Sequence, residues 1–215
     1  MSNETIRPFI QKIVTDAREY VQSLLDENRR LHSLLSEIQE ESKKASERYV
    51  EVEQQNTNLA NLYVASYQLH GTLDRERILE SMKEIIINLI GSEELAIWEV
   101  DEAREELKLA ASFGLDVQSW SSIALDSNSG IVGLVTVSGE RYIAGQSPLQ
   151  PEGRDKSLLA CIPLKLDDRV IGAIGIFSLL AQKSGLEPVD FELFDLLATH
   201  GATALYCTRL AEVAA

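Results

Sequence analysis

The stretch SLLACIPLKLDDRVIGAIGIFSLL, residues 157–180, decides the fold of this chain. Two aliphatic runs, 158–166 and 169–179, flank the pair Asp167–Asp168, and apolar runs of this length bounded by turn residues are typical of buried strands. Because Asp tolerates the backbone conformations of tight turns, the two runs are predicted to form an antiparallel hairpin. The apolar run Val170 to Ala181 is too short to span a bilayer, and two glycines interrupt it.

The residues before and after this hairpin predict further helices and strands. Asp74 is expected to cap a helix that ends at Gly91, and Ser129 to cap a short helix that ends at Gly139. A closing helix is expected from Pro188 to about Leu210. Strands are predicted at 95–100, 107–111, 121–125 and 141–144.

Taken in order, these elements resemble the GAF domain family. The matching pieces are Thr72-Leu73-Asp74 before Ile78-Leu79-Glu80, then Ala110 to Leu115, Ser129 to Gly133, Ser157 to Leu164, Arg169 to Ala173, and Asp190 through Ala204. The resemblance implies an α+β fold with an antiparallel sheet of about six strands and helices on its faces. It also implies a ligand pocket, or its remnant, on the face opposite the first and last helices.

The segment before Gly71 has a different character. All 12 glycines lie at Gly71 or later, and no proline occurs between Pro8 and Pro148, so residues 9–70 contain no helix breaker. Positions spaced alternately by three and four from Val14 are mostly apolar over eight heptads, which predicts a long coiled-coil helix. We expect this coiled coil at residues 1–57 and a GAF-like domain at residues 58–215.

Polar residues in the apolar stripe indicate how two such helices pair. Asn28 and Asn56 occupy a positions, where each can pair with its mate across a parallel two-stranded seam. A parallel homodimer is therefore predicted, and the resemblance implies that the terminal helices join it in one bundle. Leu25 and Leu34 widen the stripe, so a four-helix association or a partner helix near residues 20–38 stays open. The expected interface residues are Val21, Leu24, Asn28, Leu31, Leu35, Ile38, Val52, Asn56 and Leu59.

Composition limits the partners. With 34 Asp and Glu against 20 Lys and Arg, the net charge is −14, which opposes binding to nucleic acid and to anionic membranes. The start of the chain lacks the features of a signal peptide, so a cytoplasmic location is expected. Cys161 and Cys207 are far apart, and neither they nor the three histidines show metal-ligand spacing. No metal or cofactor is expected.

The candidate ligand residues are Trp120, Ser129, Gly130 and Tyr142. A helix that begins at Ser129 and Gly130 presents free backbone N–H groups to an anion, and Trp120 and Tyr142 can supply a stacking surface. The alternative interpretation is that Ser129 is simply a helix cap and that the two aromatic residues belong to the core. Members of the family that bind cyclic nucleotides carry a motif after the long strand, from which Ser178, Leu179, Leu186 and Phe191 depart. Members that attach a bilin use a cysteine in the segment covering the pocket, and residues 144–157 contain none.

Three functions follow from these observations. The first is a non-enzymatic, bacterial-type signalling or scaffold protein, a homodimer whose GAF-like domain binds a regulatory partner protein or filament. The second is a sensor in which a small molecule near Trp120, Ser129 and Tyr142 shifts the helices. The third is a free methionine sulfoxide reductase, because one branch of the family reduces free methionine sulfoxide with cysteines. Cys161 and Cys207 fall on a strand and on the closing helix, where buried structural cysteines are expected.

Overall fold

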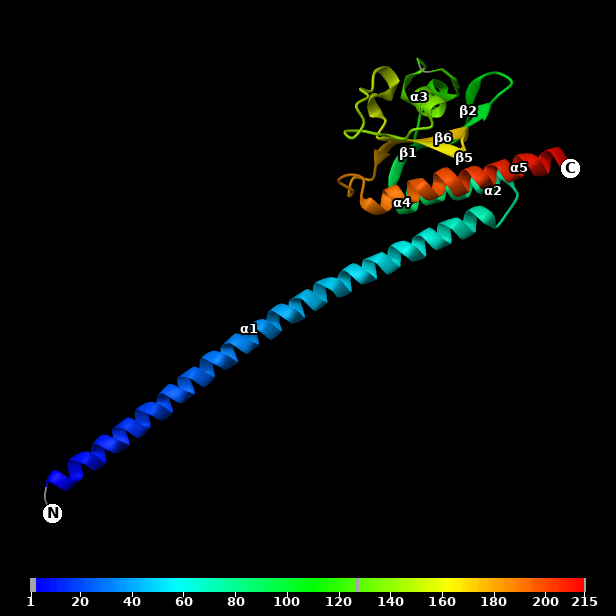
Figure 1. Ribbon diagram of the computed structural model, residues 1–215. Coiled ribbons are helices and arrows are strands. Elements are labelled where there is room, and N and C mark those ends of the chain that lie inside the picture. The colour runs from blue at the N-terminus through cyan, green and yellow to red at the C-terminus, as the bar shows by residue number, and fades with distance from the viewer. Residues whose placement is uncertain (1–2, 127, 215) are drawn as a thin grey trace. The chain divides into compact units, whose positions relative to one another are not determined.

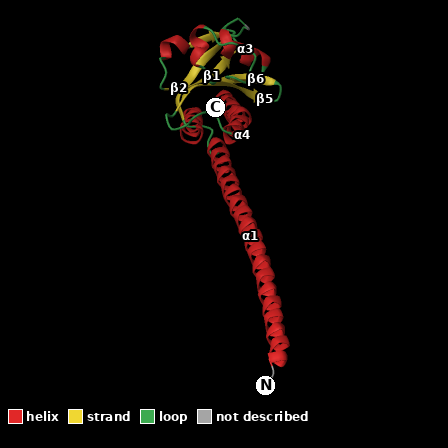
Figure 2. Ribbon diagram, turned by 90° about the vertical axis from the view of Figure 1, so that its left-hand side faces the viewer, coloured by secondary structure: helices red, strands yellow, loops and turns green. Residues whose placement is uncertain are grey.

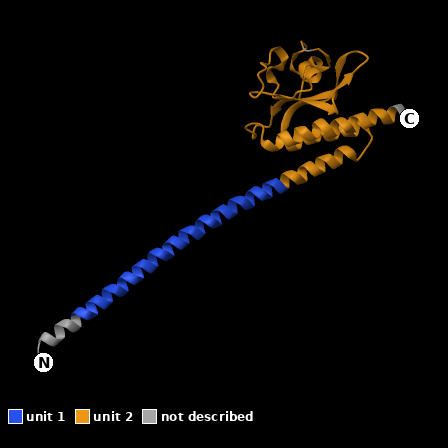
Figure 3. Ribbon diagram, viewed as in Figure 1, with its two compact units in different colours: residues 1–56 blue, residues 57–215 orange. Residues whose placement is uncertain are grey.

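A computed structural model describes residues 3–126 and 128–214, and describes the side chains of residues 11–126 and 128–212. The chain divides into two compact units, residues 1–56 and 57–215 (Figure 3). The predicted site residues all lie within the described part.

The first unit is formed by helix α1 (Asn3–His70), which continues into the second unit. Its side chains from residue 11 to residue 56 are all exposed in the single chain. The prediction of one long helix is confirmed, and the absence of Gly and Pro from residues 9–70 explains its continuity.

The second unit is built on a sheet of six antiparallel strands in the order β3-β2-β1-β6-β5-β4 (Figure 2). The strands are β1 (Ser92–Asp101), β2 (Glu106–Phe113), β3 (Ser122–Ala124), β4 (Tyr142–Ile143), β5 (Ala160–Leu166) and β6 (Arg169–Leu179). The predicted hairpin of β5 and β6 is confirmed, with Leu166 opposite Arg169 and Asp167 in the turn at φ 52°. The sequence-based prediction of a six-stranded antiparallel sheet with helices on its faces is therefore confirmed.

Helices cover both faces of this sheet (Figure 1). One face carries α2 (Arg75–Ile85), which continues as the π-helical turn η1 (Ile86–Ile90). The same face carries the closing helix, which consists of α4 (Pro188–Leu196), the π-helical turn η4 (Leu197–Gly201) and α5 (Ala202–Ala214). The other face carries α3 (Gly130–Ser138) and the 3-10 turns η2 (Val117–Trp120) and η3 (Gly153–Ser157). The sheet thus separates two cores, one under α2, α4 and α5, which we call the long helices of the sheet, and one under α3.

Capping contacts mark the boundaries of α2, η1 and the closing helix. The Asp74 carboxylate accepts the N–H groups of Glu76 and Arg77 at 3.0 and 3.3 Å, and Gly91 ends η1 in the left-handed conformation at φ 76°. At the closing helix, Asp190 Oδ2 accepts the Glu187 N–H at 2.7 Å. The apolar spacing did not predict the two π-helical turns, η1 and η4.

Two glycines of β6 allow the central strands to approach closely. A Cβ added at Gly172 would lie 2.3 Å from the backbone oxygen of Trp98 on β1. A Cβ at Gly175 would lie 2.8 Å from Cζ3 of the Trp98 ring. Because an added Cβ at either glycine would meet Trp98, the position of this indole depends on glycine at both sites.

We expect Gly172→Ala to lower the free energy of unfolding by about 1–3 kcal/mol, because the new methyl group meets backbone that cannot move aside as a side chain can. The measurement is urea unfolding followed by Trp fluorescence. Gly185→Ala is the matched control, since a Cβ there has no atom within 4 Å. Equal stability of the two variants would contradict the close approach.

Candidate functional site

The sheet face opposite the long helices, where a pocket is expected from the resemblance, is filled by an aromatic cluster. Trp98, Trp120 and Phe177 lie with ring centroids 4.8 to 6.4 Å apart. The Trp98 indole N–H donates to the backbone oxygen of Trp120 at 2.9 Å, and Trp120 is only 5% exposed. Arg154 lies over the outer side, its guanidinium carbon 4.9 Å from the Trp120 ring centroid. Trp98 and Trp120 therefore both belong to the core of this sheet face.

The N-terminus of α3 is occupied by a carboxylate of this chain. Asp155 Oδ2 accepts the Ile131 N–H at 2.6 Å, whereas the Ser129 side chain makes no capping hydrogen bond. Ser129 is the N-cap residue of α3, as predicted, but its side chain does not supply the capping hydrogen bond. Gly130 has φ 86°, and a Cβ there would lie 2.3 Å from Asp155 Oδ2, so glycine leaves room for the carboxylate. Asp155 thus holds the position in which an anionic ligand was expected.

The buried carboxylate also affects its neighbours. Asp155 is 3% exposed, and its Oδ1 has no hydrogen-bond partner among the described residues. Burial, together with the nearby charge of Asp155, raises the pKa of Tyr142 and that of Cys161, which lie opposite each other on β4 and β5. Because burial disfavours the thiolate, Cys161 is poorly suited to act as a nucleophile.

The four predicted ligand residues do not line one cavity. Ser129 and Gly130 line an open groove of about 620 Å³ together with Arg154 and Asp155. Tyr142 lines a separate groove of about 440 Å³ beside Pro148 and Leu149, while Trp120 lies in the core. The sequence-based prediction did not include Asp155, because a lone Asp in a polar loop gives no sign that its side chain binds the N-terminus of a helix.

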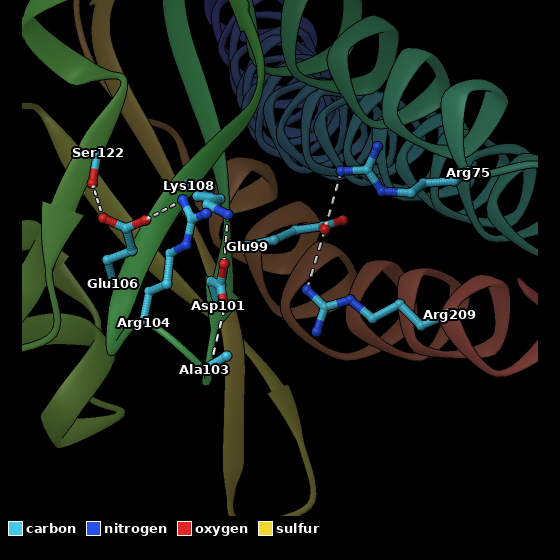
Figure 4. Close-up of polar contacts among 9 residues, drawn as sticks. All are labelled: Arg75, Glu99, Asp101, Ala103, Arg104, Glu106, Lys108, Ser122 and Arg209. Carbon is cyan, nitrogen blue, oxygen red and sulfur yellow. Dashed lines mark hydrogen bonds and ion pairs between the residues drawn. The ribbon is translucent and has the colours of Figure 1, made fainter. Parts of the chain in front are cut away.

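A second polar cluster lies on the opposite face of the sheet, between the start of α2 and the second half of α5 (Figure 4). Glu99 on β1 accepts with its Oε2 from Nη2 of Arg75 and from Nη2 of Arg209, both at 3.1 Å. The Glu99 side chain is 12% exposed, and its Oε1 has no partner among the described residues. We call Arg75, Glu99 and Arg209 the Glu99 cluster. One signal in the sequence could have revealed it, since Glu99 interrupts the apolar strand at the spacing of Leu95 and Ile97, which face the helices.

Ion pairs flank this cluster. Lys108 lies 2.5 Å from Asp101, and its hydrogen bond is the main reason that the pKa of Asp101 is lowered. Arg169 pairs with Glu102. These residues and the Glu99 cluster line a groove of about 530 Å³ together with Tyr206, Leu109 and Ala110.

The remaining candidate groups are cysteines and histidines. Both cysteines are free thiols, Cys161 buried and Cys207 half-buried. His70, the last residue of α1, forms a 2.8 Å hydrogen bond through Nε2 with Nδ1 of His200 in η4. Among the described side chains, no group of three or more His, Cys, Asp or Glu is placed to hold a metal ion. No helix in the described ranges combines the length and the apolarity needed to cross a membrane.

We expect Cys161 to resist thiol reagents in the native protein at about pH 8, because burial raises its pKa and excludes the reagent. Labelling followed by mass spectrometry should find the modification at Cys207, and Cys207→Ser should remove nearly all native labelling. Cys161→Ser is the control and should leave labelling unchanged. Labelling of Cys161 as fast as that of a free cysteine would contradict this expectation and favour the reductase.

Comparison with known proteins gives the family. The model of the GAF domain matches residues 74–207. Among curated proteins, none matches the sequence. Similar solved structures include GAF domains of phosphoenolpyruvate-protein phosphotransferases from Acinetobacter and from Coxiella burnetii. The Acinetobacter domain is 21% identical with a TM-score of 0.56, covering 72% of this chain and 96% of its own. The Coxiella domain is 18% identical with a TM-score of 0.58, covering 73% and 96%.

A third similar structure is that of an enzyme, the free methionine-R-sulfoxide reductase from Neisseria meningitidis in complex with its substrate. It is 20% identical with a TM-score of 0.55, and the match covers 70% of this chain and 89% of that one. At these identities the similarity establishes the fold. Because the family model covers more than half of the residues, this chain belongs to the GAF domain family.

Proposed function

We propose that this protein is a non-enzymatic signalling or scaffold protein, a parallel coiled-coil homodimer whose GAF domain binds a regulatory partner protein. The proposal places it in the cytoplasm, in keeping with its two free thiols. One observation carries it, namely the apolar stripe that α1 leaves uncovered.

The stripe consists of large side chains that water would surround in a single chain. Val21, Leu31 and Leu35 are each between 54% and 55% exposed, and Ile38 is 61% exposed. Burying such side chains contributes about 1.5–3 kcal/mol each, so repeated heptads supply a strong drive to associate. A second copy fits best, because its stripe has the same length and repeat.

The stripe also continues into the second unit. There Leu62, Ala65 and Leu69 of α1 pack against the core, while Leu59 and Tyr63 stay 63% and 73% exposed. The last turns of α1 thus present one face to the GAF core and another to solvent. This arrangement supports a dimer in which the ends of the helices and the GAF domains contribute together.

The filled sheet face supports recognition of a protein over recognition of a buried small molecule. The aromatic cluster occupies the expected pocket, and Asp155 takes the place of a bound anion. Open grooves remain at the surface beside α3 and beside the Glu99 cluster. Two GAF domains joined by one rod would gain avidity toward a partner, such as a filament, that presents paired sites.

We expect Leu31→Glu to weaken the dimer by at least about tenfold, because it places a carboxylate from each chain in an apolar seam. Light scattering after size-exclusion chromatography measures the change, and the unaltered protein should have twice the mass of one chain. Ser33→Glu is the matched control, since it adds the same charge two residues away on the outer side of the predicted coiled coil. A monomeric unaltered protein at micromolar concentration would refute the proposal.

Orientation is tested with Asn28→Cys in a Cys207→Ser background. A parallel pair brings the two residues 28 together and should form a disulfide under mild oxidation. Gln22→Cys, on the outer face, should crosslink far less. A dimer in which Asn28→Cys also fails to crosslink would contradict the parallel register while leaving the dimer intact.

We expect native mass spectrometry of the protein purified from its own cells to show a dimer without a bound metabolite, because the aromatic cluster fills the expected pocket. Thermal unfolding with cyclic nucleotides and with methionine sulfoxide at millimolar concentration should then show no stabilisation. A metabolite that co-purifies at one per chain would overturn the preference for a protein partner and favour the sensor.

A further inference from the structure

Positive charge gathers at one place on an otherwise acidic unit. Residues 57–215 contain 12 Lys and Arg against 23 Asp and Glu. The groove beside the Glu99 cluster, however, is lined by four basic residues and three acidic ones. The basic residues are Arg75, Lys108, Arg169 and Arg209, and the acidic ones are Glu99, Asp101 and Glu102.

The excess positive charge lies at the two arginines. Lys108 is paired with Asp101 and Arg169 with Glu102, so these flanking pairs are electrically balanced. Arg75 and Arg209, in contrast, share the single carboxylate of Glu99. Two guanidinium groups around one carboxylate leave one positive charge without a counterpart in the groove.

The two arginines also have donors to spare. Each guanidinium carries five N–H donors, and the hydrogen bonds found among the described residues use one nitrogen of each, both directed at Glu99 Oε2. Their side chains are 34% and 32% exposed. Glu99 therefore holds both guanidinium groups in place while part of each stays open to the groove (Figure 4).

We propose that this groove is a binding site for an oxyanion, a carboxylate or phosphate group held by Arg75 and Arg209. A planar guanidinium group can direct two parallel N–H donors at two oxygens of a carboxylate or of a phosphate. Leu109, Ala110 and Tyr206 supply apolar contact for the body of the ligand. The site lies on the helix-covered face of the sheet, opposite the face where the predicted ligand residues were sought, and does not depend on the proposed dimer.

The position of the site gives it a way to act on the helices. Arg75 is the first residue of α2, Arg209 lies in the second half of α5, and Glu99 ties both to β1. An anion that competes with Glu99 for these arginines redistributes their hydrogen bonds between sheet and helices. Binding in the groove would thus bias the packing of α2 and α5 on the sheet.

The test uses the full chain and inorganic phosphate, with sodium citrate as the carboxylate counterpart. Arginine side-chain Nε–Hε signals are followed by NMR during each titration, with sodium chloride at matched ionic strength as the reference. We expect saturable shifts for Arg75 and Arg209, and none for Arg104, which pairs with Glu106 outside the groove. Equal responses to chloride, or equal shifts at Arg104, would overturn the proposal.

Variants give a second measurement. Arg209→Gln should weaken phosphate binding at least about tenfold, because it removes one of the two charged donors. Arg104→Gln, the matched control, should bind phosphate as the unaltered protein does. If Arg209→Gln does not fold, the titration of the unaltered protein decides alone. A response to citrate without one to phosphate would still support the site and assign it to carboxylates.

Discussion

The packing of Trp98 against the glycines of β6 is the constraint on which the rest of the globular unit depends. Gly172 and Gly175 let β6 approach β1 so closely that an added Cβ would overlap Trp98. The indole then fills the face of the sheet that α3 covers, and its N–H is satisfied by the backbone of Trp120. Because that volume is taken, Trp98, Trp120 and Phe177 stabilise the fold and line none of the grooves described above.

At α3, too, a residue of this chain occupies the place where a ligand was expected. A helix N-terminus attracts negative charge through its free N–H groups, and here Asp155 supplies that charge from within the chain. Membership of the family does not by itself establish a ligand at this place, because fold alone does not establish function. The features accessible to other molecules are the apolar stripe along α1, the groove beside α3 and the groove beside the Glu99 cluster. This is why we place its function in association with other molecules.

The Glu99 cluster shows how a charged side chain can be kept under a helical layer. A carboxylate that is only 12% exposed needs compensation, which Arg75 and Arg209 provide from two helices far apart in sequence. These contacts connect β1 with α2 and α5. The proposed oxyanion site and the mechanical link between sheet and helices are therefore formed by the same three residues.

The sequence by itself determined the order of elements, because apolar periodicity, the cap at Asp74, the stop at Gly91 and the turn at Asp167–Asp168 are local signals. Its apolar stripe also defined the long helix, since nothing in residues 9–70 interrupts one. Only the tertiary structure decided what fills the sheet face, because the fit of Trp98 to Gly172 and Gly175 depends on strands about 75 residues apart. It alone placed Asp155 on α3 and joined Glu99 to two arginines, since the strand pattern can mark Glu99 as facing the helices but does not show which distant residues bind it.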